Sequence, residues 1–254
     1  MRICCSIALA ACFLAASLIS SAQKHDLYFG VQGGLSIPNL EAGSGATEIS
    51  KGYSSRLGPD FGIFADIHFS RLFSLQPEID YSSQGGKKNG QQAIPASNFN
   101  PQAPAGTYVY ANYKSEAKLN YLQIPVLAKF GWDFGKQQNW RFAVDVGPYV
   151  GFLVSARNVT SGSSPVYADP QETQQIAPAQ SFDASEDIKD QIHKANVGVQ
   201  GGVSLQLDIH HQGYVFLHAG GNYGFLNIQK YAEDGKNHTG AAVILLGYAI
   251  RLNG

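Results

Sequence analysis

The feature that most constrains this chain is an alternation of apolar with polar or small residues, which recurs in eight separate segments. Successive side chains of a β-strand point to opposite sides, so this alternation gives each segment one apolar face and one polar face. Phe61, Ile63 and Ile67, for example, share one face, whereas Asp66 and His68 lie on the other. No apolar face carries a charge. The predicted strands are Leu27–Ile37, Phe61–Phe69, Phe73–Tyr81, Tyr121–Phe130, Trp140–Phe152, Val197–Ile209, Val215–Phe225 and Ala241–Leu252.

The connections between these segments favour a membrane barrel over a soluble sandwich, which would bury the apolar faces. Short and long connections alternate along the chain, as they do in outer-membrane barrels with short periplasmic turns, long extracellular loops and periplasmic termini. The short ones are Ser70–Leu72, Gly131–Asn139 and His210–Gly213, and the longer ones are Pro38–Leu57, Gly85–Glu116, Ser155–His193 and Gln229–Thr239.

Aromatic residues gather near the expected strand ends, where the two membrane interfaces would lie. One group, near the short turns, comprises Phe29, Phe69, Phe73, Phe130, Trp132, Trp140, Phe142 and Tyr248, and the other comprises Phe61, Tyr81, Phe152, Tyr223 and Phe225. The polar faces are rich in glycine and serine, which suit the concave wall of a narrow barrel. We therefore predict an all-β fold, an eight-stranded antiparallel transmembrane β-barrel of the outer-membrane type with long extracellular loops.

The first 22 residues resemble a secretory signal peptide, with Arg2, an apolar run from Ile3 to Ile19, and small residues up to Ala22. We expect cleavage after Ala22, which leaves residues 23–254 as the barrel domain. A lipoprotein site at Leu9–Cys12 is the alternative. All three cysteines, Cys4, Cys5 and Cys12, lie in this leader. The mature chain would then have no disulfide, cysteine nucleophile or zinc-thiolate site. After the leader, no apolar run approaches the ~20 residues that a membrane helix needs.

The low charge of the chain argues against nucleic acid as a partner. Charged residues make up only 15% of the chain, and the formal net charge is -1. Such a chain offers no basic patch for nucleic acid. We expect outer-membrane lipid as its surroundings, no nucleic acid, no cofactor and no metal, and a monomer or an oligomer of unknown size.

Two stretches resemble the PorT-like outer-membrane β-barrel family of Bacteroidetes. They are Leu75–Lys88 (LQPEIDYSSQGGKK) and Leu119–Lys129 (LNYLQIPVLAK). The strand order and the glycine-rich pattern from Leu27 to Leu252 agree with such a barrel. The resemblance implies the fold and an outer-membrane location. The founding member of that family is linked to protein secretion across the outer membrane, but the resemblance provides no set of functional residues.

The polar faces place a set of charged residues inside the predicted barrel. One interpretation is an ionic plug in which opposite charges pair, and the other is a narrow selective pore or a proton-linked site. The interior of an eight-stranded barrel is only just wide enough for its side chains, which favours the plug. The candidate residues are Asp66, His68, Glu78, Asp80, Lys129, Arg141, Asp145, Asp208, His218 and Arg251.

Catalytic motifs are not evident in the sequence. Ser82, Ser83, His193 and His238 have no recognisable catalytic spacing, and the adjacent His210 and His211 would point to opposite faces. We therefore expect no catalytic residues, no metal site and no enzyme. The long loops provide a contact surface for a partner protein, or a solvated surface without a partner. We expect a structural or interaction role through these loops; the alternative is transport, as a narrow solute pore or a component of a protein-secretion machinery.

Overall fold

A computed structural model of the protein describes residues 26–43, 49–209, 212–231 and 235–252. The expected signal peptide, the lipoprotein site and the His210–His211 pair lie outside these residues. Apart from a short 3-10 turn (η1, Ala96–Asn98), the regular elements are strands. They are β1 (Asp26–Ala42), β2 (Gly58–His68), β3 (Phe73–Pro95), β4 (Tyr108–Phe134), β5 (Trp140–Ser161), β6 (Ser163–Tyr167), β7 (Gln175–Ser181), β8 (Ala184–Asp187), β9 (Ala195–Ile209), β10 (Gly213–Gly224) and β11 (Asn237–Leu252).

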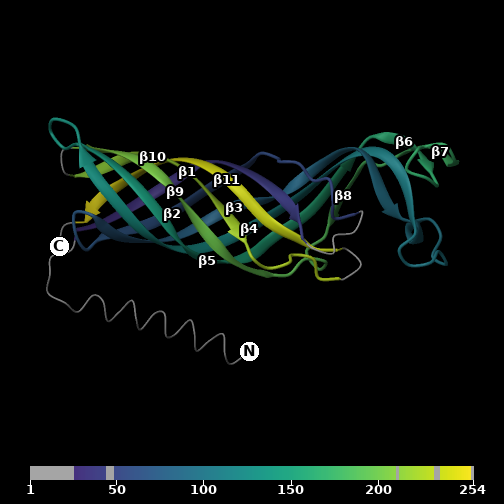
Figure 1. Ribbon diagram of the computed structural model, residues 1–254, viewed down its shortest axis with the longest axis horizontal. Helices are drawn as coiled ribbons and strands as arrows, with labels where there is room; N and C mark the ends of the chain where they lie inside the picture. The colour runs from purple at the N-terminus through teal and green to yellow at the C-terminus, as the bar shows by residue number, and fades with distance from the viewer. Residues whose placement is uncertain (1–25, 44–48, 210–211, 232–234, 253–254) are drawn as a thin grey trace, which may run out of the picture.

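Eight of these strands close into a ring in the order β1, β2, β3, β4, β5, β9, β10 and β11, with β11 paired back to β1 (Figure 1). Every pairing is antiparallel. Leu27 of β1, for example, faces Ile67 on β2 and Leu252 on β11. The predicted barrel is thus confirmed, and each predicted segment coincides with one strand of the ring. Within the described residues, no helix has the length and apolar character needed to span a membrane.

The apolar faces lie on the outside of the ring. From Phe142 to Val154 in β5, exposed residues alternate with buried ones throughout. Leu246 is 66% exposed, and Val31 and Leu35 are both more than half exposed. The buried positions of the same strands are mostly polar or small. Because a continuous apolar surface of this size is unfavourable in water, this arrangement suits a barrel surrounded by lipid.

One end of the barrel, the turn end, carries the short connections at residues 69–72 and 135–139. Aromatic rings form an exposed belt there. Phe73 contacts Phe69 and Phe130 at ring-centroid distances of 5.8 and 5.3 Å, and Trp132 stacks on Phe142 at 6.4 Å. Indole and benzyl groups favour the boundary between lipid and water, so the belt marks one membrane interface.

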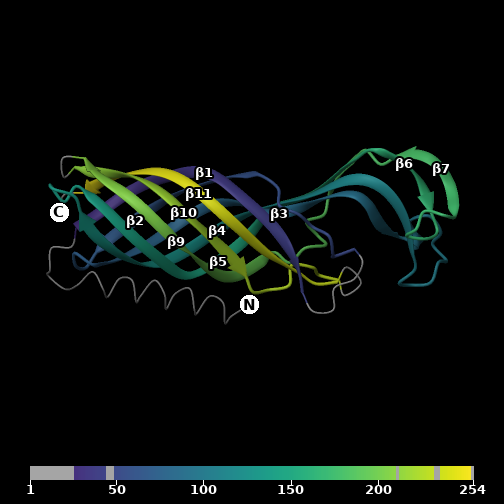
Figure 2. The same cartoon turned by 45° about the horizontal axis from the view of Figure 1, so that its top comes forward.

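At the other end, the arm end, a β-arm extends well beyond the ring (Figures 1 and 2). β3 and β4 continue their pairing as far as Pro95 and Tyr108. The ends of β5 and the strands β6, β7 and β8 pack beside them. The arm has its own apolar core, which includes Ile94, Val109 and Val166. Much of the sequence between Gly85 and Glu116, and between Ser155 and His193, is therefore ordered sheet where the sequence analysis expected loops.

The lumen is filled at the arm end by a cluster of buried apolar side chains, which we call the apolar cap. Its members come from β1, β4, β5 and two connecting segments that fold over the mouth. They are Leu40, Ala117, Leu119, Tyr121, Leu153, Ala156, Ile192 and Ile228. Because strands from several sides of the ring meet in this cluster, the cap closes the interior at that end.

Candidate functional site

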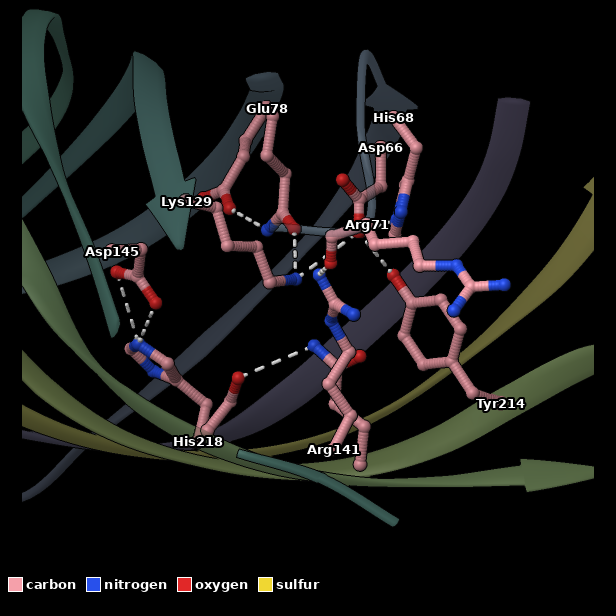
Figure 3. A network of polar contacts seen from close by, with 12 residues as sticks. Asp66, His68, Arg71, Glu78, Lys129, Arg141, Asp145, Tyr214 and His218 are labelled. Atoms are coloured by element: carbon pink, nitrogen blue, oxygen red, sulfur yellow. Dashed lines mark hydrogen bonds and ion pairs between the residues drawn. The ribbon is translucent and has the colours of Figure 1, made fainter. Parts of the chain in front are cut away.

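The candidate site is the polar interior of the barrel, where inward-facing positions of several strands meet (Figure 3). Asp66 of β2 lies at its centre and is fully buried. Its Oδ2 atom lies 3.2 Å from Lys129 Nζ and accepts a 2.8 Å hydrogen bond from the Tyr214 hydroxyl. His68 Nε2 lies 3.2 Å from the same oxygen. One carboxylate oxygen therefore holds side chains from β2, β4 and β10 together.

Glutamine side chains extend this cluster along the lumen. Lys129 Nζ donates to Gln76 Oε1 at 2.6 Å, and Gln76 Nε2 donates to Glu78 Oε1 at 2.5 Å. The Gln32 amide then donates to Glu78 Oε2 at 3.2 Å and to Asp80 Oδ1 at 3.0 Å. An unbroken chain of contacts thus runs from Asp66 to Asp80 across β1, β2, β3 and β4.

A second pair lies beside this chain. His218 of β10 points at Asp145 of β5, with 3.3 Å between His218 Nε2 and Asp145 Oδ2 (Figure 3). Both side chains are at least nine-tenths buried. The expected site residues Asp66, His68, Glu78, Asp80, Lys129, Asp145 and His218 therefore all lie in the lumen, in these two groups.

The other three expected site residues lie at the turn end instead. Arg141 Nη1 binds Asp133 Oδ1 at 2.7 Å, and its Nη2 donates to the Arg71 carbonyl at 2.8 Å. Arg251 pairs with Asp26. Asp208 lines an open cavity of about 470 Å³ at this mouth, together with both arginines. These three residues occupy positions of inward parity on their strands, but parity does not determine how deep in the lumen a side chain lies.

Several lumen residues were missed by the sequence analysis. Asp60 is 5% exposed and accepts a 2.8 Å hydrogen bond from Ser82. Asp60 has the same parity as Asp66, but it lies one residue before Phe61, the start of the predicted strand. Tyr214 was missed for the same reason, one residue before Val215. Gln32 and Gln76 have the inward parity as well, and only their lack of charge kept them out of the candidate set.

The lumen charges are unequal in number. Asp60, Asp66, Glu78, Asp80 and Asp145 are buried there, and Lys129 is the one buried lysine among the described residues. Arg56 is buried as well, but it pairs with Glu116 and donates to the Gln84 carbonyl at the arm end. The five lumen carboxyl groups therefore face one lysine, Lys129, and two histidines, His68 and His218. Because uncompensated charge is costly in a low-dielectric interior, this lumen has to hold additional protons or cations. Within the described ranges, no three side chains from His, Cys, Asp or Glu are grouped to hold a metal ion.

The middle of the lumen leaves almost no free space. The gap bounded by Gln32, Glu78, Lys129 and His218 has a volume of about 10 Å³. That is the space of roughly one water molecule. The interior is therefore open at the turn end, filled by polar side chains in the middle and closed by the apolar cap. Among the described residues, the middle of the lumen leaves room for about one water molecule.

A closed antiparallel ring with a lipid-compatible outer surface and a polar interior defines an outer-membrane β-barrel. The family comparison is more particular: the model of the outer membrane protein beta-barrel domain matches residues 21–230. The chain belongs to this family, and its location is the outer membrane. The match is to this broad family and does not extend to the narrower PorT-like resemblance. A search of curated protein sequences found no match.

Solved structures with a similar fold include three bacterial outer-membrane proteins. Ail of Yersinia pestis, solved with the heparin analogue sucrose octasulfate, is 11% identical, with 89% of this chain and 99% of that chain covered and a TM-score of 0.39. OprG of Pseudomonas aeruginosa is 8% identical, with 89% and 96% covered and a TM-score of 0.39. The outer membrane protease OmpT of Escherichia coli is 8% identical, with 91% and 99% covered and a TM-score of 0.36.

One expectation from the sequence is corrected by this comparison. The sequence shows no recognisable catalytic spacing, and the chain was therefore expected not to be an enzyme. The similar structures include a protease, OmpT, together with the translocator domain of an autotransporter, NalP of Neisseria meningitidis. Barrels of this general kind include enzymes, so the exclusion was wrong and the enzyme status is open. At 8–10% identity these neighbours assign no catalytic residue to this chain.

Proposed function

We propose that this protein is a membrane anchor that presents its β-arm outside the cell for contact with a partner protein. The observation that carries the proposal is the combination of a filled lumen with an ordered arm. A barrel that only needed to close would gain nothing from continuing β3 and β4 to Pro95 and Tyr108. The arm's buried core gives it a defined shape, as a recognition surface requires.

The proposed orientation places the arm outside and both termini in the periplasm. It is supported by the short connections at the turn end, which are typical of periplasmic turns. An epitope inserted at residues 101–105, in the turn between η1 and β4, tests it. Antibody should label this epitope on intact cells, whereas an epitope at residues 136–138 should need permeabilised cells. The reverse labelling would contradict the orientation.

The contact role is tested by photo-crosslinking from the arm in living cells. Exposed apolar residues there are Phe99 and Ile176, which are 44% and 55% exposed. A photoreactive residue at either position should give one discrete crosslinked product, and the same residue at Gln137 in the turn end should not. Removing residues 88–114 should abolish the product while leaving the heat-modifiable migration of the barrel. Identical crosslinks from all three positions would argue against the proposal.

Transport is a second candidate, favoured by the excess of lumen carboxyl groups. Protons held by those groups would exchange between neighbouring side chains, and a narrow proton or cation path would follow. Vesicles containing the purified barrel and a pH-sensitive dye test this. Flux that is lost in Asp145→Asn, but kept in Asp133→Asn at the turn end, would favour transport over the anchor. Stable, large conductance in planar bilayers would contradict the filled lumen itself.

A second form of the transport function is a role as a component of a protein-secretion machinery. It is supported by the PorT-like stretches, which lie on β3 and β4 and pair with each other, Tyr81 opposite Leu122 and Gln84 opposite Leu119. β3 and β4 are also the two strands that continue into the arm. Purification of the native protein in mild detergent should then recover a stoichiometric complex with other envelope proteins. Recovery of the barrel alone would favour the anchor.

A further inference from the structure

A cavity of about 150 Å³ lies at the arm end, within the apolar cap. Its walls include Leu40 of β1, Leu119 of β4, and Tyr53, Ile188, Ile192 and Ile228 from the connecting segments. The lining also includes the side chains of Asn158, Gln191 and Gln229. Among the described residues, no charged side chain lines it, although the polar lumen beneath it is rich in carboxyl groups. Its chemistry is therefore separate from that of the lumen.

Polar contacts outside the cavity hold its roof in place. Arg56 Nε binds Glu116 at 2.8 Å, and Lys88 Nζ lies 4.3 Å from the centre of the Tyr53 ring. The segment that carries Ile188 and Ile192 is tied to the segment that carries Ile228. His193 N–H donates to the Ile228 carbonyl at 2.9 Å, and Lys230 N–H donates to the Gln191 carbonyl at 3.0 Å. Because these contacts already hold the lining segments in place, a ligand would not have to order them, and the entropic cost of binding is smaller.

Size and lining together restrict what can occupy this space. A cavity of ~150 Å³ is large enough for a molecule the size of benzene, and this one is lined by aliphatic side chains together with polar groups. The amides of Asn158, Gln191 and Gln229 add hydrogen-bonding groups that a pure hydrocarbon would leave unused. A charged ligand would lose its hydration without gaining an opposite charge from the described lining residues.

We propose that this cavity binds one small uncharged molecule with an apolar ring or branched chain and a single hydroxyl or carbonyl group, about the size of phenol. The aliphatic walls take up the apolar part. The side-chain amides supply a partner for the polar group, which orients the molecule. The site lies in the cap, so it adds a small-molecule ligand to the proposed contact role of the arm.

Phenol itself is the probe, and isoleucine methyl groups are the reporters. With selectively labelled isoleucine in lipid nanodiscs, the methyl resonances of Ile188, Ile192 and Ile228 should shift and saturate as phenol is added. Ile124, Ile244 and Ile250 face outward and are 37%, 51% and 43% exposed, so they report partition into the lipid. Shifts of similar size at both groups, without saturation, would overturn the proposal.

A filling variant and a matched control complete the test. Ala117 lines the cavity and is 6% exposed, so Ala117→Leu fills part of the space and should weaken phenol binding by at least about tenfold. Ala128→Leu makes the same change on the outer face of the same strand and should leave binding unchanged. If Ala117→Leu fails to fold, Ile228→Ala serves instead, because the larger cavity should then favour a larger phenol such as 4-ethylphenol. Unchanged affinities in both cavity variants would refute the site.

Discussion

Replacing Lys129 with methionine tests the energetic basis of the lumen cluster. The substitution keeps the length of the side chain but removes its charge. It breaks the 3.2 Å ion pair with Asp66 and the 2.6 Å hydrogen bond to Gln76. Removing one partner of a buried ion pair costs about 3–5 kcal/mol, because the other charge is left buried. Asp66 keeps its contacts with Tyr214 and His68, so we expect a loss near the lower limit, about 3 kcal/mol.

Urea unfolding in lipid vesicles, followed by the fluorescence of Trp132 and Trp140, measures this loss. The control is Lys118→Met in the arm. Lys118 is 41% exposed and lies 3.4 Å from Glu116, so its removal should cost less than about 0.5 kcal/mol. Adding Asp66→Asn to Lys129→Met should recover part of the loss, because the stranded charge is removed as well. Our reasoning would be refuted if the free energy of unfolding of Lys129→Met lay within about 0.5 kcal/mol of the wild-type value.

Three further predictions concern packing and the arm. A methyl group at Gly62 would lie 1.9 Å from Asp80 Oδ1 and 2.6 Å from the Ile79 carbonyl oxygen. Gly62→Ala should therefore lower the free energy of unfolding by about 1–3 kcal/mol. Gly33→Ala is the control and should cost clearly less, because the nearest atom to its methyl group would lie at an ordinary 3.6 Å. Phe64 is 2% exposed and packs edge-on against Phe216 at 5.5 Å, so Phe64→Ala should cost about 3–5 kcal/mol in the same assay. Hydrogen bonds from the Gly162 N–H and the Ser181 hydroxyl lower the pKa of Asp183 from its ordinary 3.8. Ionised Asp183 therefore stabilises the folded arm above pH 3.8, and this stabilisation is lost as the pH falls below that value. Between about pH 4 and 5, where pepsin is still active, the wild-type arm should therefore be cleaved more slowly than the Asp183→Asn arm, and this difference should disappear as the pH falls further.

The ring of the barrel was predictable because lipid imposes a simple rule on its outer face. Every second residue of β5 from Phe142 to Val154 has to be compatible with lipid, so the alternation can be read from the sequence. The rule ends where the strand leaves the membrane. At that point β5 also carries an extra residue, because Tyr121 pairs with Leu153 whereas Asn120 pairs with Ser155. Such a bulge shifts the alternation and bends the strand.

The β-arm could not be predicted for this reason. Its outer residues face water, so β3 beyond Gly85 shows no apolar face along its whole length. Its order comes from pairing with β4, Lys87 opposite Glu116 through to Pro95 opposite Tyr108. It also comes from contacts such as the stacking of Tyr113 on Phe182 at 4.7 Å, which join residues almost 70 positions apart. Contacts between distant segments leave no periodic signal in either segment.

The buried carboxyl groups of the lumen are separated from one end of the barrel and lie near a cavity at the other. The excess of carboxyl groups arises because the inward-facing arginines lie at a different depth in the barrel. Arg141 and Arg251 bind Asp133 and Asp26 at the turn end, and so they do not pair with the buried carboxyl groups. The apolar cap separates those groups from the arm end, whereas the 470 Å³ cavity opens at the turn end beside His68 and Tyr214. Among the described residues, the polar interior is therefore most accessible from the turn end, where His68 and Tyr214 line the cavity and contact Asp66.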